Sequence, residues 1–266
     1  MQPRVFSVVT NPTQYNACVK QNPYLKNCIC QFATNTPPAC NISIATHYNR
    51  FIDEVILPEE QDGWVIFCHQ DFEWLEDPAA ALDKLNPQII YGPAGMQRVE
   101  YHWGKYTFTS GKSYCQLTSG PFVVGIYSTH PQPVDTLDCC CICVHSSLLK
   151  QRRLRFDDYF DFHCYAEDFC LNAHQQGVQI YAIQLACNHY SNGKLSRIFF
   201  ERYDKLLCKY PQELFVTPLV KIRWSKKGHF PSYNTLPLLY LLAHGIVLPL
   251  KTLRAKITHF FRRRCS

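Results

Sequence analysis

The run Trp64-Val65-Ile66-Phe67-Cys68 constrains the fold of this 266-residue chain more than any other segment. It is continuously apolar, and three polar residues, His69, Gln70 and Asp71, follow it at once. A strand covered on both faces has such a run, whereas a half-exposed strand alternates between apolar and polar residues. We therefore predict an α/β protein, and the ends of its strands are where a ligand would bind.

The rest of the chain supplies further elements for such a sheet. The run that ends at Thr10 is β-branched and aromatic and breaks at Asn11-Pro12, which is typical of a buried first strand. Asp77-Pro78 has the cap and first-turn proline of a helix, and Gly177 is a plausible helix stop. We expect strands at residues 5–10, 41–45, 64–68 and 178–185, helices at 47–55, 77–85 and 163–175, and short strands with loops between 89 and 127.

The net charge of +6 is concentrated near the C-terminus. Residues 236–250 are nearly all apolar, too few to span a bilayer, and basic residues dominate the segment 251–264 behind them. This favours an interfacial contact with an anionic membrane over nucleic-acid binding, and a pair of helices packed on the domain is the alternative. We expect a catalytic domain at 1–210 and a helical apolar and basic tail at 211–266.

The fifteen cysteines do not indicate a secreted disulfide protein. The apolar run 5–9 is too short for a signal peptide, so we expect a cytoplasmic chain with reduced thiols, peripheral on the inner face of the membrane. In Cys139-Cys140-Cys141-Ile142-Cys143, neighbouring side chains on a strand would point to opposite faces and cannot share one ion. A zinc or redox site using Cys140 with Cys143, or Cys28 with Cys30, stays open as a minor alternative.

Polar residues capable of chemistry follow several of the expected strands. Asp71 and Glu73 follow the buried run, Asp138 follows another strand, and His189 follows the last one. The pair Glu167-Asp168 heads a helix, where the helix dipole favours a carboxylate. Each has an ordinary explanation as a cap or loop residue, but together they predict a site for a divalent cation and a diphosphate.

Five motifs in order carry a family resemblance: His69-Gln70-Asp71, Leu137-Asp138, Arg155-Phe156-Asp157, the segment from His163 to Leu171, and the segment from His189 to Gly193. Over about residues 5–194 the chain resembles the family-2-like glycosyltransferases of bacterial surface polysaccharide and lipopolysaccharide synthesis, in the branch with an HQD variant of the DxD motif. The resemblance implies a GT-A fold, a Rossmann-like mixed sheet flanked by helices.

The resemblance also implies roles for single residues. Asp71 matches the last acid of DxD, which binds the metal and the diphosphate, and His189 matches a late histidine that meets the metal. His69 replaces the first acid, which contacts the nucleoside, so that contact is altered here. Asp168 matches the general base of the ED-type motif, and Glu73 is a further candidate ligand.

The remaining implied roles concern the two substrates. The residues that would bind the nucleotide-sugar donor are Thr10, Asn11, His69, Gln70 and Asp71. Those that would line the sugar and acceptor pocket are Asp138, His163 and Glu167.

The implied activity is inverting transfer of a sugar from a nucleotide-sugar donor to a hydroxyl of a glycan or glycolipid acceptor, with Mn²⁺ or Mg²⁺ as cofactor. Asp168 would take the acceptor proton while the metal neutralises charge on the leaving diphosphate. Whether a hexosyl or an N-acetylhexosaminyl group is moved stays open. The main alternative is a protein of the same fold that binds nucleotide sugars without transferring them, because fold alone does not prove activity.

Overall fold

The computed structural model describes residues 1–103, 106–115, 117–119, 122–124, 126–191, 196–211 and 222–226. Two compact units divide the chain, Met1–Trp224 and Ser225–Ser266. The predicted division at 210 and the predicted membrane contact of the tail stay predictions, since residues 236–264 lie outside the described part. No described helix is long and apolar enough to cross a membrane.

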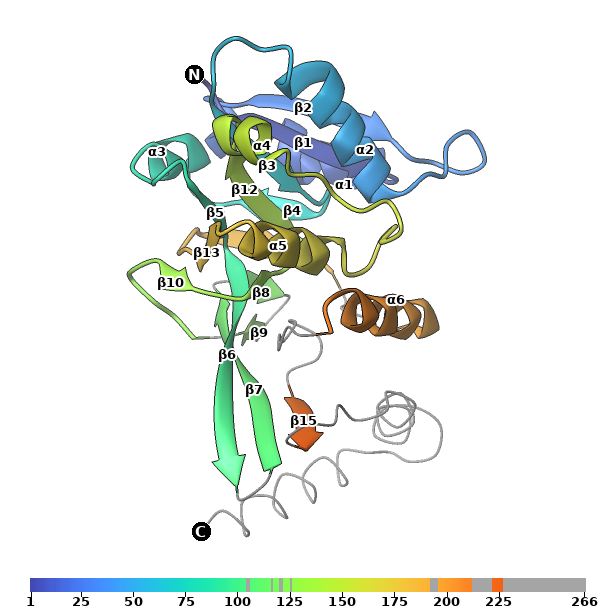
Figure 1. Cartoon of the computed structure of the whole chain (residues 1–266). Helices are drawn as coiled ribbons and strands as arrows, with labels where there is room; N and C mark the ends of the chain where they lie inside the picture. The colour runs from blue at the N-terminus through green and yellow to red at the C-terminus, as the bar shows by residue number, and fades with distance from the viewer. Residues whose placement is uncertain are drawn as a thin grey trace. The chain divides into compact units, whose positions relative to one another are not determined.

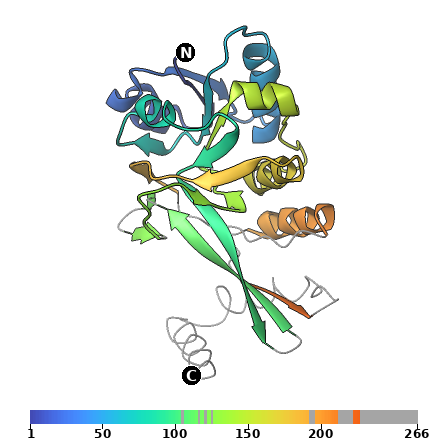
Figure 2. The ribbon, with the colours of Figure 1, turned by 60° about the vertical axis from the view of Figure 1, so that its left-hand side comes forward.

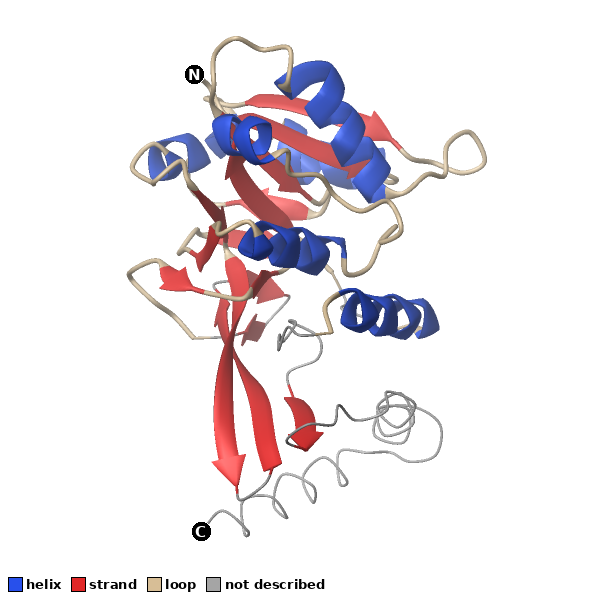
Figure 3. Cartoon of the chain, in the orientation of Figure 1, coloured by secondary structure: helices blue, strands red, loops and turns tan. Residues whose placement is uncertain are grey.

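A seven-stranded mixed sheet forms the centre of the first unit (Figures 1 and 3). Three neighbouring strands, β2 (Ile29–Thr34), β1 (Arg4–Val9) and β3 (Trp64–Cys68), run parallel. The strand β12 (Cys141–His145) lies antiparallel between β3 and β5 (Ile89–Gly92). The predicted α/β class with a mixed sheet is therefore confirmed. In spatial order the strands are β10 (Gln132–Pro133), β13 (Gln179–Ala182), β5 (Ile89–Gly92), β12 (Cys141–His145), β3 (Trp64–Cys68), β1 (Arg4–Val9) and β2 (Ile29–Thr34).

Helices cover both faces of this sheet. In both ribbon views α2, α4 and α5 lie on one face, and α1 and α3 lie on the other (Figures 1 and 2). The first face is aromatic: Phe6 stacks on Phe51 with ring centroids 4.2 Å apart, and Phe156 stacks on Phe169 at 4.3 Å. The helices are α1 (Pro12–Tyr15), α2 (Ile44–Phe51), α3 (Pro78–Leu82), α4 (Ser146–Arg152), α5 (Tyr165–Gln175) and α6 (Arg197–Lys209), with short turns of other helix types at Asn16–Lys20, Pro23–Leu25 and Ile52–Ile56.

Two smaller sheets complete the described strands. One has the order β11 (Thr136–Leu137), β6 (Ala94–Trp103), β7 (Tyr106–Cys115) and β15 (Ile222–Lys226). The other has the order β4 (Phe72–Trp74), β14 (Cys187–His189), β8 (Leu117–Ser119) and β9 (Phe122–Val124). The antiparallel pair β4 and β14 matters most, because it sets His189 opposite Phe72, the residue after Asp71.

The expected strand at 41–45 is wrong. Ser43 is instead the N-cap of α2, with its hydroxyl accepting a hydrogen bond from the Thr46 amide, and Ile44 already lies in the helix. The second strand of the sheet is β2, which the sequence did not reveal. As an edge strand β2 is only partly buried, so it lacks the continuous apolar run that marks β3.

The other expected strands and helices are present in the described structure, but β6 and β7, with ten residues each, are longer than the short strands expected between 89 and 127. All five residues of β3 are buried, Asp77 caps α3, and Gly177 ends the helix region of α5 with a φ of 74°. His189 departs slightly, since it is the last residue of the short strand β14 rather than part of a loop. The cysteines whose side chains are described are all free thiols.

Candidate metal centre

A tight turn after β3 carries Asp71, the residue predicted to bind the metal and the diphosphate. The amide of His69 donates to the Cys140 carbonyl at 2.9 Å, and the amide of Phe72 donates back to the His69 carbonyl at 3.2 Å, so the chain reverses directly into β4. The Asp71 carbonyl accepts from the amide of Tyr190 at 3.1 Å. These bonds and the β4–β14 pairing hold the turn His69-Gln70-Asp71, called the HQD turn below, against the end of β14.

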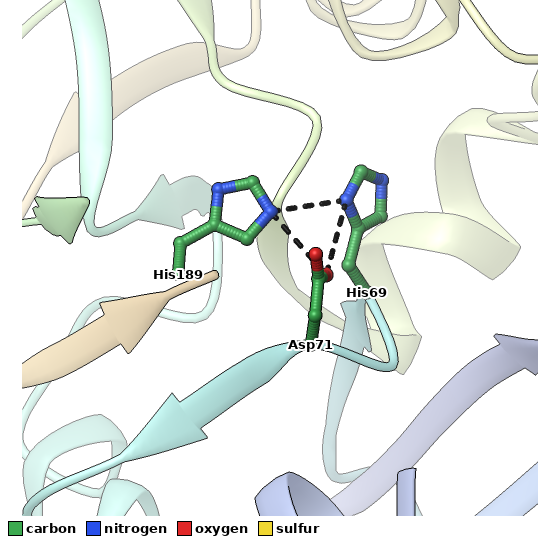
Figure 4. Close-up of side chains that lie close together, drawn as sticks. All are labelled: His69, Asp71 and His189. Carbon is green, nitrogen blue, oxygen red and sulfur yellow. Dashed lines mark hydrogen bonds and ion pairs between the residues drawn. The ribbon is translucent and has the colours of Figure 1, made fainter. Parts of the chain in front are cut away.

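His69, Asp71 and His189 converge at this point (Figure 4). His189 Nε2 lies 3.4 Å from Asp71 Oδ1, His69 Nδ1 lies 3.9 Å from the same oxygen, and the two ring nitrogens are 3.4 Å apart. One ligand atom of each residue therefore lies within 4.8 Å of the others, a spacing compatible with a shared cation. The side chains are mostly buried, with exposures of 14%, 17% and 11% respectively.

The contacts of His69 favour one tautomer of its imidazole ring. The Tyr165 hydroxyl donates to the Cys139 carbonyl at 2.8 Å. His69 Nε2 lies 2.8 Å from the same hydroxyl, and we assign the ring proton to this nitrogen because the hydroxyl then accepts from it. Nδ1 is then an unprotonated acceptor directed at Asp71 and His189, which is the state that a metal requires.

The charges of the cluster suit the same role. Burial, reinforced by the charge of His189, lowers the pKa of His69 to about 4, so this imidazole is neutral at pH 7. Burial alone would raise the pKa of Asp71, but its hydrogen bond and ion pair with His189 outweigh burial and lower it. Burial would lower the pKa of His189, yet the Asp71 hydrogen bond and the Asp138 charge raise it. The cluster thus offers a carboxylate, and His189 would have to be neutral to bind a metal, so metal binding would compete with its protonation.

Asp138 lies beside this cluster. Its Oδ1 accepts a hydrogen bond from the Cys140 amide at 2.9 Å. Asp138, Cys140 and His189 form a second group of ligand atoms within 4.8 Å of one another among the described residues. The cysteine-rich run therefore contributes one thiol near the site, although Cys141 and Cys143, whose sulfurs are 4.0 Å apart, belong to neither group.

The structure also brings the expected nucleotide-docking residues together. Gln70 Oε1 accepts from the amides of Thr10 and Asn11, each at 2.8 Å, and its Nε2 donates to Thr10 Oγ1 at 3.0 Å. Asn11 is the N-cap of α1 and accepts from the Gln14 amide. Gln70 thereby links the end of β1 to the HQD turn by hydrogen bonds. Thr10 and Asn11 therefore lie next to the cluster, on its β1 side.

The acidic pair at the start of α5 is buried. Asp168, only 1% exposed, accepts from Tyr210 Oη at 2.9 Å and pairs with Lys209 Nζ at 2.7 Å, which joins it to the end of α6. Burial raises the pKa of Asp168 although Lys209 opposes the shift. Burial, with repulsion from Asp138, raises the pKa of Glu167 to about 8. Glu167 Oε2 and Asp168 Oδ2 have no hydrogen-bond partner among the described residues.

Two other candidates, Glu73 and His163, are not members of the cluster. Glu73 Oε2 accepts from Tyr190 Oη at 2.6 Å and from Asn188 Nδ2 at 2.8 Å, and Glu73 belongs to neither group of ligand atoms. His163 lies next to α6, with Nε2 3.4 Å from Ser196 Oγ. The sequence did not identify His69 as a ligand. Its position two residues before Asp71 was a usable signal, because the two ends of a tight turn can face the same side.

Comparison with known proteins gives little further identification. The sequence matches no protein-family model and no curated protein. Among solved structures, the chain is similar to one described as the crystal structure of GalNAc-T7 with UDP, GalNAc and Mn²⁺, with a TM-score of 0.49 and 8% identity. The similarity covers 77% of this chain and 48% of that one, so the chain spans about half of its length.

Proposed function

We propose that this chain binds a divalent cation through His69, Asp71 and His189 and is a metal-dependent glycosyltransferase. The observation that supports the cation is the convergence of three ligand atoms within 4.8 Å at the end of β3, with His69 Nδ1 held as a lone pair. Two imidazoles and one carboxylate suit Mn²⁺ better than Mg²⁺, which prefers oxygen ligands and retains its waters. When bound, the cation would neutralise charge on the diphosphate of a nucleotide-sugar donor.

Support for the sugar-nucleotide donor comes from the order of the motifs and from the position of the cluster. The cluster lies at the carboxyl ends of β3 and β1, where open α/β sheets bind ligands, and Thr10, Asn11 and Gln70 adjoin it. We assign these three residues to the nucleotide, and a glycan or glycolipid of surface polysaccharide synthesis to the acceptor side.

The acidic pair supplies the base in this proposal. Asp168 would take the proton of the acceptor hydroxyl while that oxygen attacks the sugar from the face opposite the leaving diphosphate, which inverts the anomeric centre. The oxygen that would accept that proton is Asp168 Oδ2, which is buried and has no hydrogen-bond partner among the residues that the structure describes. Lys209 beside it keeps a positive charge near the carboxylate.

Mn²⁺ binding tests the metal centre directly. Calorimetric titration of Mn²⁺ into the metal-free protein should give one site that Asp71→Ala abolishes, because Asp71 is the one carboxylate of the triad. Glu73→Gln is the matched control, since Glu73 is two residues away, bonds Tyr190 and Asn188, and keeps an acceptor oxygen as glutamine. Undiminished Mn²⁺ binding by Asp71→Ala would contradict the proposal.

Donor binding can be followed in the same preparations. A thermal-shift screen of nucleotide sugars with and without Mn²⁺ should show one donor that stabilises the wild type more than its bare nucleotide does. The stabilisation should require Mn²⁺ and Asp71. No stabilisation by any nucleotide sugar would remove the support for a donor site.

A second function, binding of nucleotide sugars without transfer, is favoured by the environment of Asp168. Its side chain is 1% exposed and already bonded to Lys209 and Tyr210. Release of nucleoside diphosphate in the presence of Mn²⁺, a donor panel and acceptors distinguishes the two functions. Turnover establishes the transferase, whereas tight donor binding without turnover establishes the binder.

A further inference from the structure

Phe162 is an exposed aromatic residue next to the metal centre. Its side chain is 55% exposed, and its ring lies nearly parallel to that of His69, at an interplanar angle of 12° and a centroid distance of 6.3 Å. His69 is a member of the metal cluster. Single exposed apolar residues are common on proteins, so exposure alone carries no functional meaning. Phe162 differs from such residues because hydrogen bonds restrain the backbone of the loop that carries it.

The backbone around Phe162 is fixed from two sides. The Phe162 amide donates to Asp161 Oδ1 at 2.9 Å, and the Asp161 carboxylate receives two hydrogen bonds of 3.1 Å from Arg202 of α6. The Asp161 carbonyl accepts from the amide of Ile44, the first residue of α2, at 2.9 Å. The ring also meets the edge of His163 at 5.1 Å. The ring is therefore presented to solvent by a restrained loop, which lowers the entropic cost of stacking a ligand on it.

A sugar ring is the ligand that fits such a position. The face of an aromatic ring carries partial negative charge, and a pyranose presents a flat row of weakly positive C–H groups that can stack on it while its hydroxyls stay hydrated. The loop that carries Phe162 enters α5, whose first turn holds Glu167 and Asp168. The nucleotide side of the site, at Thr10 and Asn11, lies instead at the end of β1.

We propose that Phe162 is the stacking platform that positions the pyranose ring of the acceptor. This inference rests on the proposed transferase function, because the acceptor hydroxyl has to reach the acidic pair that this loop leads to. Phe162 is a positioning residue here and takes no part in proton transfer. Its contribution is to hold the ring in the orientation that the reaction needs.

Tyr159 provides a matched control on the same loop. It is also aromatic and exposed, at 45%, but its ring lies under the Arg202 guanidinium at 4.7 Å and near Lys205 Nζ at 5.4 Å. These cations belong to α6. Replacement of Tyr159 therefore removes an exposed aromatic from the loop without removing the ring next to His69.

The test measures binding of methyl glycosides of glucose, galactose and N-acetylgalactosamine to the full chain with Mn²⁺ present, by saturation-transfer NMR. At least one should bind the wild type, and Phe162→Ala and Phe162→Leu should weaken its affinity about tenfold, as loss of an aromatic stack predicts. Phe162→Trp and Tyr159→Ala should bind it as the wild type does. Leucine is informative because it keeps apolar bulk and lacks the aromatic face.

Mn²⁺ affinity measured on the same variants separates this inference from the metal centre. All four should bind Mn²⁺ as the wild type does. The stacking inference is overturned if no methyl glycoside binds the wild type, if Phe162→Ala binds one unchanged, or if Tyr159→Ala weakens binding equally. Absence of Mn²⁺ binding by the wild type would instead overturn the proposed metal centre.

Discussion

Replacement of Glu167 by glutamine should stabilise the metal-free protein at pH 8 and leave its stability nearly unchanged at pH 5. Glu167 is 4% exposed, and its Oε2 has no hydrogen-bond partner among the described residues. Burial, with repulsion from Asp138 and Asp168, raises its pKa from 4.5 to about 8. The folded protein therefore keeps a proton on Glu167 at neutral pH that the unfolded chain has already released.

The sign and size of the effect follow from this difference in bound protons. The stabilising contribution of protonated Glu167 is complete below pH 4.5 and is lost as the pH rises through about 8. Between these limits the free energy of unfolding falls by about 1.4 kcal/mol per pH unit. Between pH 5 and pH 8 the loss is thus about 4 kcal/mol, which glutamine avoids because it does not ionise.

The assay is urea unfolding of both proteins at several pH values between 5 and 8, with EDTA present and tryptophan fluorescence as the signal. The difference in free energy of unfolding between Glu167→Gln and the wild type is the informative quantity, because the histidines with lowered pKa values are the same in both proteins. A difference that does not change with pH would show that Glu167 is ionised in the fold and would refute the reasoning. Glu60→Gln is a control, since its carboxylate is on the surface.

Three further predictions concern the helix cap, the sheet and the acidic pair. Ser43→Ala should lower the free energy of unfolding by about 1 kcal/mol, measured by urea unfolding, because it removes the hydrogen bond to the Thr46 amide at the start of α2; an unchanged midpoint would show that the cap contributes nothing. Gly92→Ala should destabilise the protein by about 1–3 kcal/mol in the same assay, since a Cβ there would lie 2.8 Å from the Cys141 carbonyl oxygen and backbone would have to move; full stability would show that the strands yield easily. Asp168→Asn should abolish sugar transfer, measured by nucleoside diphosphate release, while donor binding in the thermal-shift assay persists; a fully active variant would exclude Asp168 as the base.

The sequence predicted the parts of the fold that local patterns encode. The continuous burial of β3, the capping of α3 by Asp77 and the end of α5 at Gly177 were all accessible from single segments. The edge strand β2 was missed and residues 41–45 were assigned wrongly. Residues 41–45 alternate between polar and apolar residues as a strand does, yet Ser43 caps α2 and Ile44 begins it. Such short segments take their structure from the neighbours against which they pack.

For the candidate site, the sequence indicated which strand ends to examine. It could not show that β4 and β14 pair, and this pairing is what brings His189 to Asp71. It also could not show that Tyr165 hydrogen-bonds to His69 or that Lys209 and Tyr210 contact Asp168, since these contacts join segments far apart in the chain.

The pairing of β4 with β14 has a consequence for how the protein would respond to metal supply. His69 and His189 are 120 positions apart in the chain, and a shared cation would fasten them at the point where the two strands meet. An ion that binds only the folded chain adds about 2.7 kcal/mol of stability at a free concentration one hundred times its dissociation constant. The cation would then link an early and a late segment of the chain reversibly. Its concentration would affect the free energy of unfolding of the domain as well as its activity.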